Sequence, residues 1–363
     1  MILVAHEKLR QTAASLLTAA GLPDHHAEAA AAGLIRADLR GVETHGVSNM
    51  LRNYLQWLED GSLNPRPKLR TAWSLGGLEA VDSDRGLGLA IMPEIVEKTV
   101  ARAAESGIAA TAVLNGRHAG MLAHHALLAA EKGMIGICLT ATSARVVPTW
   151  GREPRLGTNP IAIAAPMTDG RYLAFDAATS MVAGNRVTTA LRTGAKLPRG
   201  SIVYDTGATN DGPTEASRDY LRRLAPLGGL ADEASHKGYG LAVLVELLCG
   251  TLFDDGGLPE RPPGGATHFM CVIAPPAGER PSMIASVTRL AEYLTATPPA
   301  EGRERVLYPG QLEAEEEVRR RAGGVPLHPE VYRWISGACE KYGVEVPAPL
   351  AAPVQAHEAG VGP

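Results

Sequence analysis

The spacing of apolar residues predicts helices along the first 75 residues of the chain. One helix is predicted from Asp24, its expected N-cap, to Gly41, because alanines and aliphatic residues recur there on one face. A second helix is predicted from Val47 to Leu58, where apolar residues recur at i, i+3, i+4, i+7, i+8 and i+11. Each of these helices is expected to bury one face, so residues 1–75 are predicted to form a helical domain.

Between residues 76 and 299 the pattern changes to short apolar runs that alternate with helical ones. Strands are predicted at 78–81, 108–114, 134–140, 161–166, 172–175 and 269–274. Helices are predicted at 91–105, 121–132, 181–192, 238–253 and 283–293. The apolar helix at 238–253 is too short to span a bilayer and contains Glu246, so we expect it to be buried in the protein. Residues 76–299 are therefore predicted to form a central α/β domain.

The last part of the chain returns to charged, amphipathic helices. Pro298 and Pro299 interrupt the pattern, and helices are predicted at 312–321 and 328–342. We expect the segment 300–345 to complete the N-terminal helical domain, which gives an α/β (α+β) fold overall. Residues 346–363 are rich in Ala, Pro and Gly, and a flexible tail is predicted there.

Composition and charge exclude several classes of partner. Lys and Arg number 35 and Asp and Glu 39 among 363 residues, which gives a net charge of −4, and no basic run is present. Nucleic acid and membranes are therefore not expected partners. The four cysteines, at 138, 249, 271 and 339, form no CxxC pair, and each lies in or beside an apolar run. They indicate reduced core thiols in a cytoplasmic protein.

Two common kinds of site are disfavoured by spacing. The strand at 78–81 precedes Gly86-Leu87-Gly88, but Ile91 stands where the third glycine of a dinucleotide fingerprint belongs, so a glycine-rich turn is preferred to a Rossmann motif. His118, His124 and His125 are close in sequence, but the last two project about 100° apart on a helix. No acidic residue nearby completes a metal-binding set, so no metal is expected.

Polar residues gather where predicted strands and helices meet, and loops held in this way often carry catalytic groups. Thr44 and His45 lie before Gly46, and His118 follows a strand. Each histidine can alternatively do no more than hydrogen-bond its own turn. Asp176 closes a strand, where it can either hold a ribose or, with Ser180, cap the next helix. Lys237 precedes a glycine-rich helix start, which suits a phosphate, although an exposed lysine with no role is the simpler interpretation.

Taken in order, these motifs resemble the type 2 malate/L-lactate dehydrogenase family, which includes ureidoglycolate and sulfolactate dehydrogenases and cyclic ketimine reductases. The resemblance runs from Leu9 to Tyr342. It rests on the segments 37–41, 44–47, 116–118, 156–160, 176–180, 226–229, 237–241 and 308–310. The family resemblance implies an NAD(P)-dependent oxidoreductase on a mixed sheet that is not a Rossmann domain, and a homodimer. Either NAD or NADP is expected.

The resemblance also assigns roles by position. His118 matches the family's proton donor and acceptor, and Thr44 and His45 match a pair that lines the substrate site. The substrate is also expected to meet Thr158 and Asn159. The positions that match cofactor-binding residues of the family are Thr142, Asp176, Ala177, Ala178, Lys237, Pro309 and Gly310.

One departure from the family bears on the substrate. Asn49 stands where many 2-hydroxy-acid enzymes of the family have an arginine for the substrate carboxylate. Arg52 and Arg145 are the alternative cations, since a guanidinium binds a carboxylate in a bidentate manner. The expected reaction is hydride transfer to or from a small 2-hydroxy or 2-oxo acid. Reduction of a cyclic ketimine and non-catalytic ligand binding are the alternatives.

Overall fold

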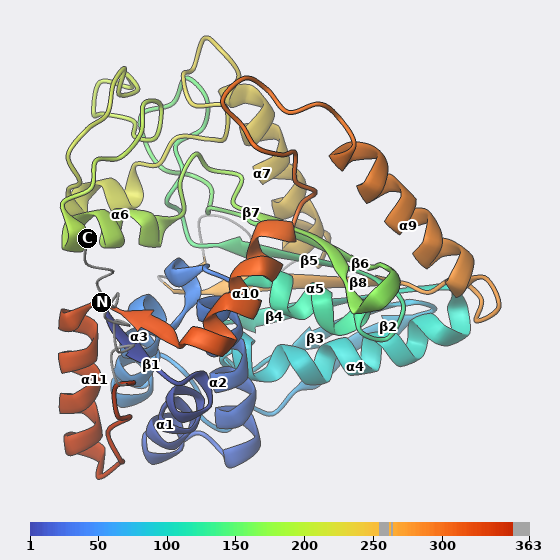
Figure 1. Ribbon diagram of the computed structural model, residues 1–363, viewed down its shortest axis with the longest axis horizontal. Helices are drawn as coiled ribbons and strands as arrows, with labels where there is room; N and C mark the ends of the chain where they lie inside the picture. The colour runs from blue at the N-terminus through green and yellow to red at the C-terminus, as the bar shows by residue number, and fades with distance from the viewer. Residues whose placement is uncertain (254–260, 263, 351–363) are drawn as a thin grey trace, which may run out of the picture.

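The computed structural model describes residues 1–253, 261–262 and 264–350, and a seven-stranded mixed sheet lies at its centre (Figure 1). The strands pair in the order β2-β3-β4-β8-β5-β6-β7, and only β3 and β4 run parallel. The strands are β2 (Arg70–Leu75), β3 (Leu78–Asp82), β4 (Ile108–Gly116), β5 (Ile135–Thr142), β6 (Ile161–Pro166), β7 (Tyr172–Ala177) and β8 (Ala266–Ile273). A Rossmann domain requires parallel strands, so this sheet agrees with the incomplete glycine fingerprint.

Helices cover both faces of the sheet. On one face α4 (Gly88–Ser106) and α5 (Leu122–Ala130) bury aliphatic side chains against the strands. On the other, α7 (Ser235–Cys249) packs through Val245 and Cys249 against β5. We predicted a buried helix at 238–253, and this prediction is wrong for the side of α7 that faces away from β5. Leu241, Leu244 and Leu247 are 39%, 46% and 52% exposed there.

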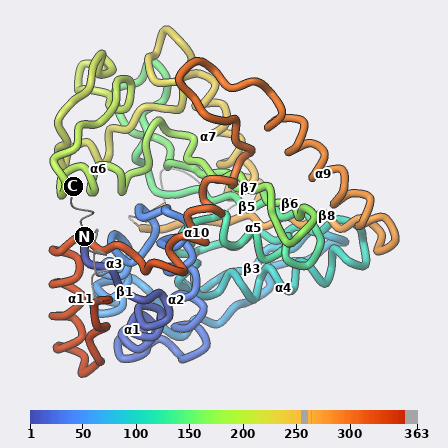
Figure 2. Tube along the Cα trace, viewed as in Figure 1, coloured from blue at the N-terminus to red at the C-terminus, as the bar shows by residue number. Residues whose placement is uncertain are grey.

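The two ends of the chain form one helical layer beside the sheet (Figure 2). Apolar residues between Val4 and Leu63 share a buried core with residues between Val325 and Cys339. The elements of this layer are β1 (Ile2–Val4), α1 (His6–Ala19), α2 (Asp24–Leu39), the 3₁₀ turn η1 (Glu43–His45), α3 (Val47–Glu59), β9 (Val325–Leu327) and α11 (Pro329–Tyr342). Between this layer and β7 lies α10 (Gln311–Gly323).

The remaining elements flank the sheet. A further apolar cluster, which includes Val146, Val187 and Leu224, holds the loops around α6 together. The elements outside the layers above are η2 (Thr168–Gly170), α6 (Gly184–Thr193), η3 (Arg218–Arg222), η4 (Thr251–Phe253) and α9 (Arg280–Thr295).

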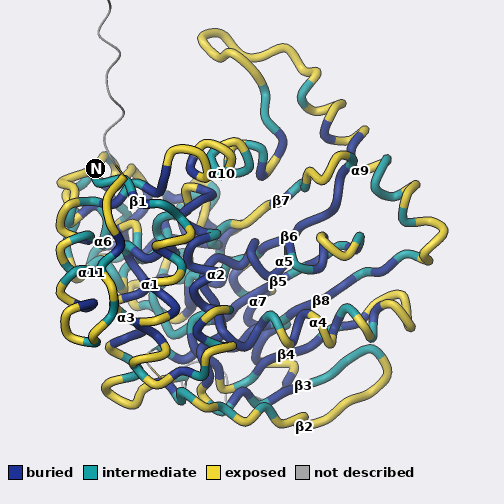
Figure 3. The backbone as a smooth tube through the Cα atoms, turned by 60° about the horizontal axis from the view of Figure 1, so that its bottom comes forward, coloured by how far each residue is buried: buried dark blue, intermediate teal, exposed yellow. Residues whose placement is uncertain are grey.

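Several expectations about local structure need correction. β2 lies among the residues expected to be helical, yet it pairs with β3, and all six of its residues are exposed (Figure 3). Asp24 is the first residue of α2 rather than its N-cap, which is Pro23, and its carboxylate accepts a hydrogen bond from Thr18. Residues 346–350 are docked on the protein, since the Leu350 N–H donates to Leu3 O at 2.8 Å. The rest of the predicted tail, 351–363, lies outside the described residues.

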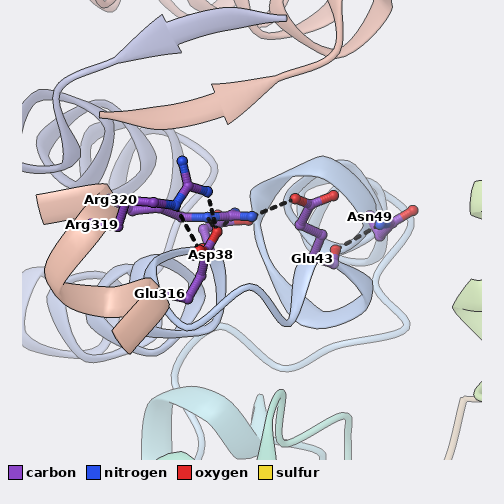
Figure 4. A network of polar contacts seen from close by, with 6 residues as sticks. All are labelled: Asp38, Glu43, Asn49, Glu316, Arg319 and Arg320. Carbon is purple, nitrogen blue, oxygen red and sulfur yellow. Dashed lines mark hydrogen bonds and ion pairs between the residues drawn. The ribbon is translucent and has the colours of Figure 1, made fainter. Parts of the chain in front are cut away.

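A polar network fixes the turn between α2 and α3 (Figure 4). The buried Asp38 carboxylate accepts the Val47 N–H at 2.9 Å, which satisfies a free donor at the start of α3. Arg320 of α10 donates to Asp38 O at 2.8 Å and to the Glu43 carboxylate at 2.9 Å. The η1 turn is therefore held from α2, α3 and α10 together.

Gly46 permits this arrangement, because a Cβ at that position would lie 1.8 Å from Asp38 Oδ1. We expect Gly46→Ala to lower the free energy of unfolding by about 2 kcal/mol or more, since Asp38 must move away from the start of α3. Gly337 is the matched control. It lies inside α11 with open space at its Cβ position, and Ala should stabilise that helix by about 0.5–1 kcal/mol. Urea unfolding measures both changes, and equal effects would contradict the steric argument.

Candidate active site

A cavity of about 300 Å³ lies where the ends of β5, β6 and β7 meet α3, α5 and α6. Small residues and hydroxyl groups form the wall on the sheet side, and Met50 and Trp57 stand on the α3 side. Nine of the expected site residues line the cavity: Thr44, His45, His118, Thr142, Arg145, Thr158, Asp176, Ala177 and Ala178. Loops far apart in sequence are therefore brought to one site.

His118 follows β4 and is held through one ring nitrogen. Its Nδ1 lies 2.7 Å from the Tyr54 hydroxyl and accepts the Gly120 N–H at 3.2 Å. The ring stacks on His45 with centroids 5.5 Å apart and planes 5° from parallel. The Thr44 hydroxyl in turn lies 2.9 Å from His45 Nδ1. Since Nδ1 of His118 is occupied, Nε2 is the nitrogen left for a molecule in the cavity.

Burial keeps these histidines uncharged. Desolvation holds the pKa of His118 well below its usual value, and the neighbouring His45, His268 and Arg145 lower it further. Burial lowers the pKa of His45 to about 4. Both imidazoles are therefore neutral at pH 7, and His118 is available to accept a proton.

Arg145 supplies a positive charge to the cavity. It lies beside the first residue of α6, since a Cβ on Gly184 would be 3.6 Å from its Nη1. Its guanidinium donates to Leu221 O at 3.4 Å, and no carboxylate of the described residues pairs with it. Arg40, the other arginine in the cavity wall, pairs with Glu317 at 3.2 Å. Arg145 and the start of α6 thus suit a bound anion.

Asn159 supports the site from behind rather than lining it. Its fully buried side chain accepts the Thr142 N–H at 3.1 Å and donates to Ala242 O at 3.0 Å and to Glu246 Oε2 at 3.1 Å. Both ends of the amide are occupied, so the geometry favours a positioning role for Asn159 over direct contact with substrate. The backbone that carries Thr142 is thereby tied to α7.

Asp176 lies in the cavity and caps a helix, although not the one that follows it. Its carboxylate accepts the Ala123 N–H at 2.7 Å at the start of α5. Burial raises its pKa to about 6, against the effect of the α5 N–H groups. The Ser180 hydroxyl donates to Val182 O at 2.8 Å and does not cap α6. The alternative in which Asp176 and Ser180 cap the following helix is therefore wrong.

Besides Asn159, four expected residues do not line the cavity. Arg52 projects from the outer side of α3, exposed, with its guanidinium 5.9 Å from the Trp334 ring. Lys237 is exposed in the first turn of α7. Pro309 and Gly310 lie directly behind the wall, because Ala174 donates its N–H to Pro309 O at 3.0 Å. A Cβ on Gly310 would come within 2.7 Å of Ala174 O, and its φ of 90° also favours glycine.

The sequence did not single out Asn53 and Asn185, which line the cavity from α3 and α6. Asn53 lies three residues after Met50 and four before Trp57, so the helical period of α3 places these cavity residues on neighbouring positions of one face. The helical periodicity of residues 47–58 could therefore have identified Asn53 from the sequence. Nothing in the sequence around Asn185 marks it in the same way.

The buried pair His124 and His125 is structural in character. Their rings meet edge to face at 5.0 Å, and His125 Nε2 lies 2.8 Å from Ala119 O. Within the described ranges, no three His, Cys, Asp or Glu side chains gather in a way that suits a metal ion. Over the same ranges, no helix is long and apolar enough to cross a membrane.

The mixed sheet carries a cavity that holds a neutral histidine together with an arginine that has no carboxylate partner among the described residues, and such a cavity suits a small anionic molecule. Residues 4–336 match the family model described as malate/L-lactate dehydrogenase, and the chain belongs to this family. It is therefore a dehydrogenase or reductase and not a non-catalytic binding protein.

Individual relatives agree with this assignment. The chain is 36% identical over 252 residues to a malate dehydrogenase of Pyrococcus horikoshii, and the matched region covers 69% of each chain. It is 32% identical over 350 residues to an L-lactate dehydrogenase of Cupriavidus necator, and the matched region covers 93% of this chain and 97% of that one.

Solved structures share the fold. The crystal structure of malate dehydrogenase from Entamoeba histolytica superposes with a TM-score of 0.88 at 26% identity, over 95% of this chain and 99% of that one. A Δ1-piperideine-2-carboxylate reductase from Pseudomonas syringae superposes with a TM-score of 0.78 at 25% identity, over 93% of this chain and all of that one.

The buried histidines predict how stability depends on pH. Burial lowers the pKa of His45, His118, His124, His125 and His268, so the unfolded chain binds protons near pH 6.5 that the folded chain does not. The free energy of unfolding should therefore fall as the pH drops from 7 towards 4. The fall is up to about 1.4 kcal/mol per pH unit for each such histidine.

Two carboxyl groups oppose this trend. Burial raises the pKa of Asp38 to about 7 and that of Asp176 to about 6, so their contribution declines as the pH rises. The five histidines outnumber them, and the melting temperature should be lower at pH 5 than at pH 7.5. His25→Gln, at an exposed position, should leave this difference unchanged. Equal melting temperatures at the two pH values would contradict the burial argument.

Proposed function

We propose that this enzyme transfers a hydride between an NAD(P) nicotinamide and C2 of a small 2-hydroxy or 2-oxo acid, with His118 as the acid/base. The observation that carries the proposal is that one cavity holds His118 Nε2 and the Arg145 guanidinium. Among the described residues, nothing bonds to this Nε2 and no carboxylate pairs with this guanidinium. A hydroxy acid needs both groups, one for the proton on its oxygen and one for its carboxylate.

The cavity wall also fits a dinucleotide. Ala177, Ala178 and Gly265 leave the backbone accessible to a flat ring, and a dinucleotide needs such close approach. The hydroxyls of Thr142 and Ser143 offer hydrogen bonds to ribose or amide groups. When bound there, the nicotinamide supplies hydride transfer. We place Pro309 and Gly310 behind this wall, and Lys237 at its outer margin as a contact for phosphate.

His118 is arranged to handle the proton. The Gly120 N–H can only donate, so it favours an unprotonated Nδ1 and a hydrogen on Nε2, where the ring can donate to a carbonyl oxygen. Nε2 can accept a proton only in the other tautomer, which carries its hydrogen on Nδ1. The Tyr54 hydroxyl can accept a hydrogen bond from Nδ1–H, so it supports this tautomer and also the protonated ring. Arg145 orients the carboxylate so that C2 faces the histidine.

The low pKa of His118 predicts how the rates of oxidation and reduction change with pH. Oxidation of a hydroxy acid uses the neutral ring as base, so it should persist below pH 6.5 until His118 is protonated. Reduction uses a proton delivered through the same ring, so it should rise as the pH falls below 7. The pH profiles of oxidation and reduction are therefore expected to differ: oxidation persists below pH 6.5, and reduction becomes faster as the pH falls below 7.

Reduction of a cyclic ketimine acid is the second candidate function. It is supported by the structural likeness to the Δ1-piperideine-2-carboxylate reductase from Pseudomonas syringae. The same cavity suits such a substrate, because Arg145 can hold its carboxylate. A panel of pyruvate, oxaloacetate and cyclic ketimines, each with NADH and NADPH, separates the two functions and identifies the cofactor.

His118→Asn tests the assignment of the acid/base. We expect kcat to fall by at least about a hundredfold, because a positioned acid/base is worth roughly 10² to 10⁴ in rate. Protection of the protein against heat by the dinucleotide should be retained, since the ring binds the substrate side of the cavity. His25→Asn, at an exposed position on α2, is the control and should keep full activity. Unchanged turnover in His118→Asn would refute the assignment.

We also infer that the chain forms a homodimer in a reducing compartment such as the cytoplasm. The exposed leucines of α7, at 241, 244 and 247, form an apolar stripe that a second copy can cover. All four cysteines are buried and free, which suits a reducing environment.

The double variant Leu244→Glu/Leu247→Glu should sediment as a monomer, because it places charges in this stripe. Val318→Glu, which adds a charge at a 71% exposed position on α10, should not change the sedimentation coefficient. A dimer that persists in the double variant would show that α7 is not the contact.

A further inference from the structure

Two asparagines in the cavity wall have side chains that are bonded through their nitrogens. Asn53 donates its Nδ2 to Asn49 O at 3.0 Å, and Asn185 donates its Nδ2 to Thr44 O at 2.7 Å. A carbonyl oxygen can only accept, so these bonds establish which end of each amide is nitrogen. No donor among the described residues reaches either Oδ1, and both residues line the cavity. Two acceptors therefore remain for a bound molecule.

These two acceptors lie on the substrate side of the site. Both amide nitrogens contact the sulfur atom of Met50, at 3.9 Å and 3.0 Å. The partner of Asn185 is Thr44, whose neighbour His45 stacks on His118. The acceptors thus stand next to the histidine that handles the proton.

Of the two described arginines that line the cavity, only Arg145 is left to bind a substrate carboxylate, because Arg40 pairs with Glu317. Arg145 lies beside Gly184, the residue directly before Asn185, and has no carboxylate partner among the described residues. Arg192 is nearby, but it donates to Ser48 O at 3.3 Å and to Asn49 Oδ1 at 3.5 Å and does not line the cavity. A second substrate carboxylate near the asparagines would face lone pairs and lose its hydration without compensation.

Building on the proposed function, we propose that the preferred substrate has a single carboxylate and carries a hydrogen-bond donor at its other end. Hydroxyl, amide and amine groups are donors of this kind. The carboxylate binds Arg145 at the start of α6, and the donor binds Asn53 Oδ1 and Asn185 Oδ1. Dicarboxylates such as oxaloacetate are poorer substrates, since their second carboxylate has only acceptors to meet.

Three 2-oxo acids of nearly equal shape test this directly with the wild-type enzyme. They are oxaloacetate, its C4 amide 2-oxosuccinamate, and 4-methyl-2-oxopentanoate, which end in a carboxylate, an amide and an isopropyl group. The measurement is kcat/KM for reduction with NADH and with NADPH. We expect the amide to exceed oxaloacetate by at least about tenfold and to exceed the apolar acid as well. Any order in which the amide is not first overturns the inference.

Asn53→Lys tests which residue is responsible. A lysine at this position replaces an acceptor by a cation, so oxaloacetate should overtake the amide. Gln56→Lys is the matched control, because it adds the same charge on the same helix at an exposed position and should preserve the wild-type order. An unchanged order in a folded Asn53→Lys enzyme would also overturn the inference. If this variant does not fold, the wild-type order decides.

The result also separates this inference from the proposed function. If neither pyruvate nor any of the three acids is reduced with either cofactor, the proposed function fails and the inference fails with it. If only pyruvate is reduced, the inference alone fails. If the three acids are reduced but oxaloacetate is equal to or better than the amide, only the inference fails.

Discussion

A single buried guanidinium joins the C-terminal part of the chain to the substrate side of the cavity. Arg320 is 7% exposed and binds Asp38 O, the Glu43 carboxylate and Glu316 at once. A buried charge is tolerated only when it is fully paired, so α10, the end of α2 and the η1 turn constrain one another. The turn carries Thr44 and His45, and α10 begins at the Pro309–Gly310 contact with β7. The η1 part of the cavity wall and the segment behind β7 therefore depend on one ionic network.

Desolvation is the second feature that shapes the site. The same burial that keeps His118 and His45 neutral raises the pKa of Asp176 and Asp38. In such surroundings each polar group must find a partner within the protein or in the ligand. The groups that lack a full set of partners are therefore informative, and Arg145 stands out because no carboxylate in the described part of the chain pairs with it. The chemistry proposed for the enzyme follows from what this site leaves unsatisfied.

Periodicity predicted the six central strands and the main helices, because each buries an apolar face. It missed β2, whose residues are all exposed and whose place is set by pairing with β3. Polar residues at the ends of strands indicated the region of the site, and the family resemblance assigned their roles. Of the two candidate cations, Arg52 lies on the outer side of α3, whereas Arg145 lines the cavity.

The roles of polar side chains were harder to predict, because they depend on contacts between distant segments. Asn159 is a support because Glu246, 87 residues further on, takes its amide hydrogen. Asp176 caps α5 rather than the helix that follows it, which no local pattern indicates. The free oxygens of Asn53 and Asn185 became visible only when the partners of their amide nitrogens were known.

The most direct test of the account is the charge state of His118 in the folded enzyme. Nitrogen-15 NMR of histidine-labelled protein, assigned by comparison with His118→Asn, reports the protonation of both ring nitrogens across a pH titration. We expect a neutral ring at pH 7 and a pKa below 6.5. A doubly protonated ring at pH 7 would contradict the account, because the site would then not exclude the charge on which the proposed proton transfer depends.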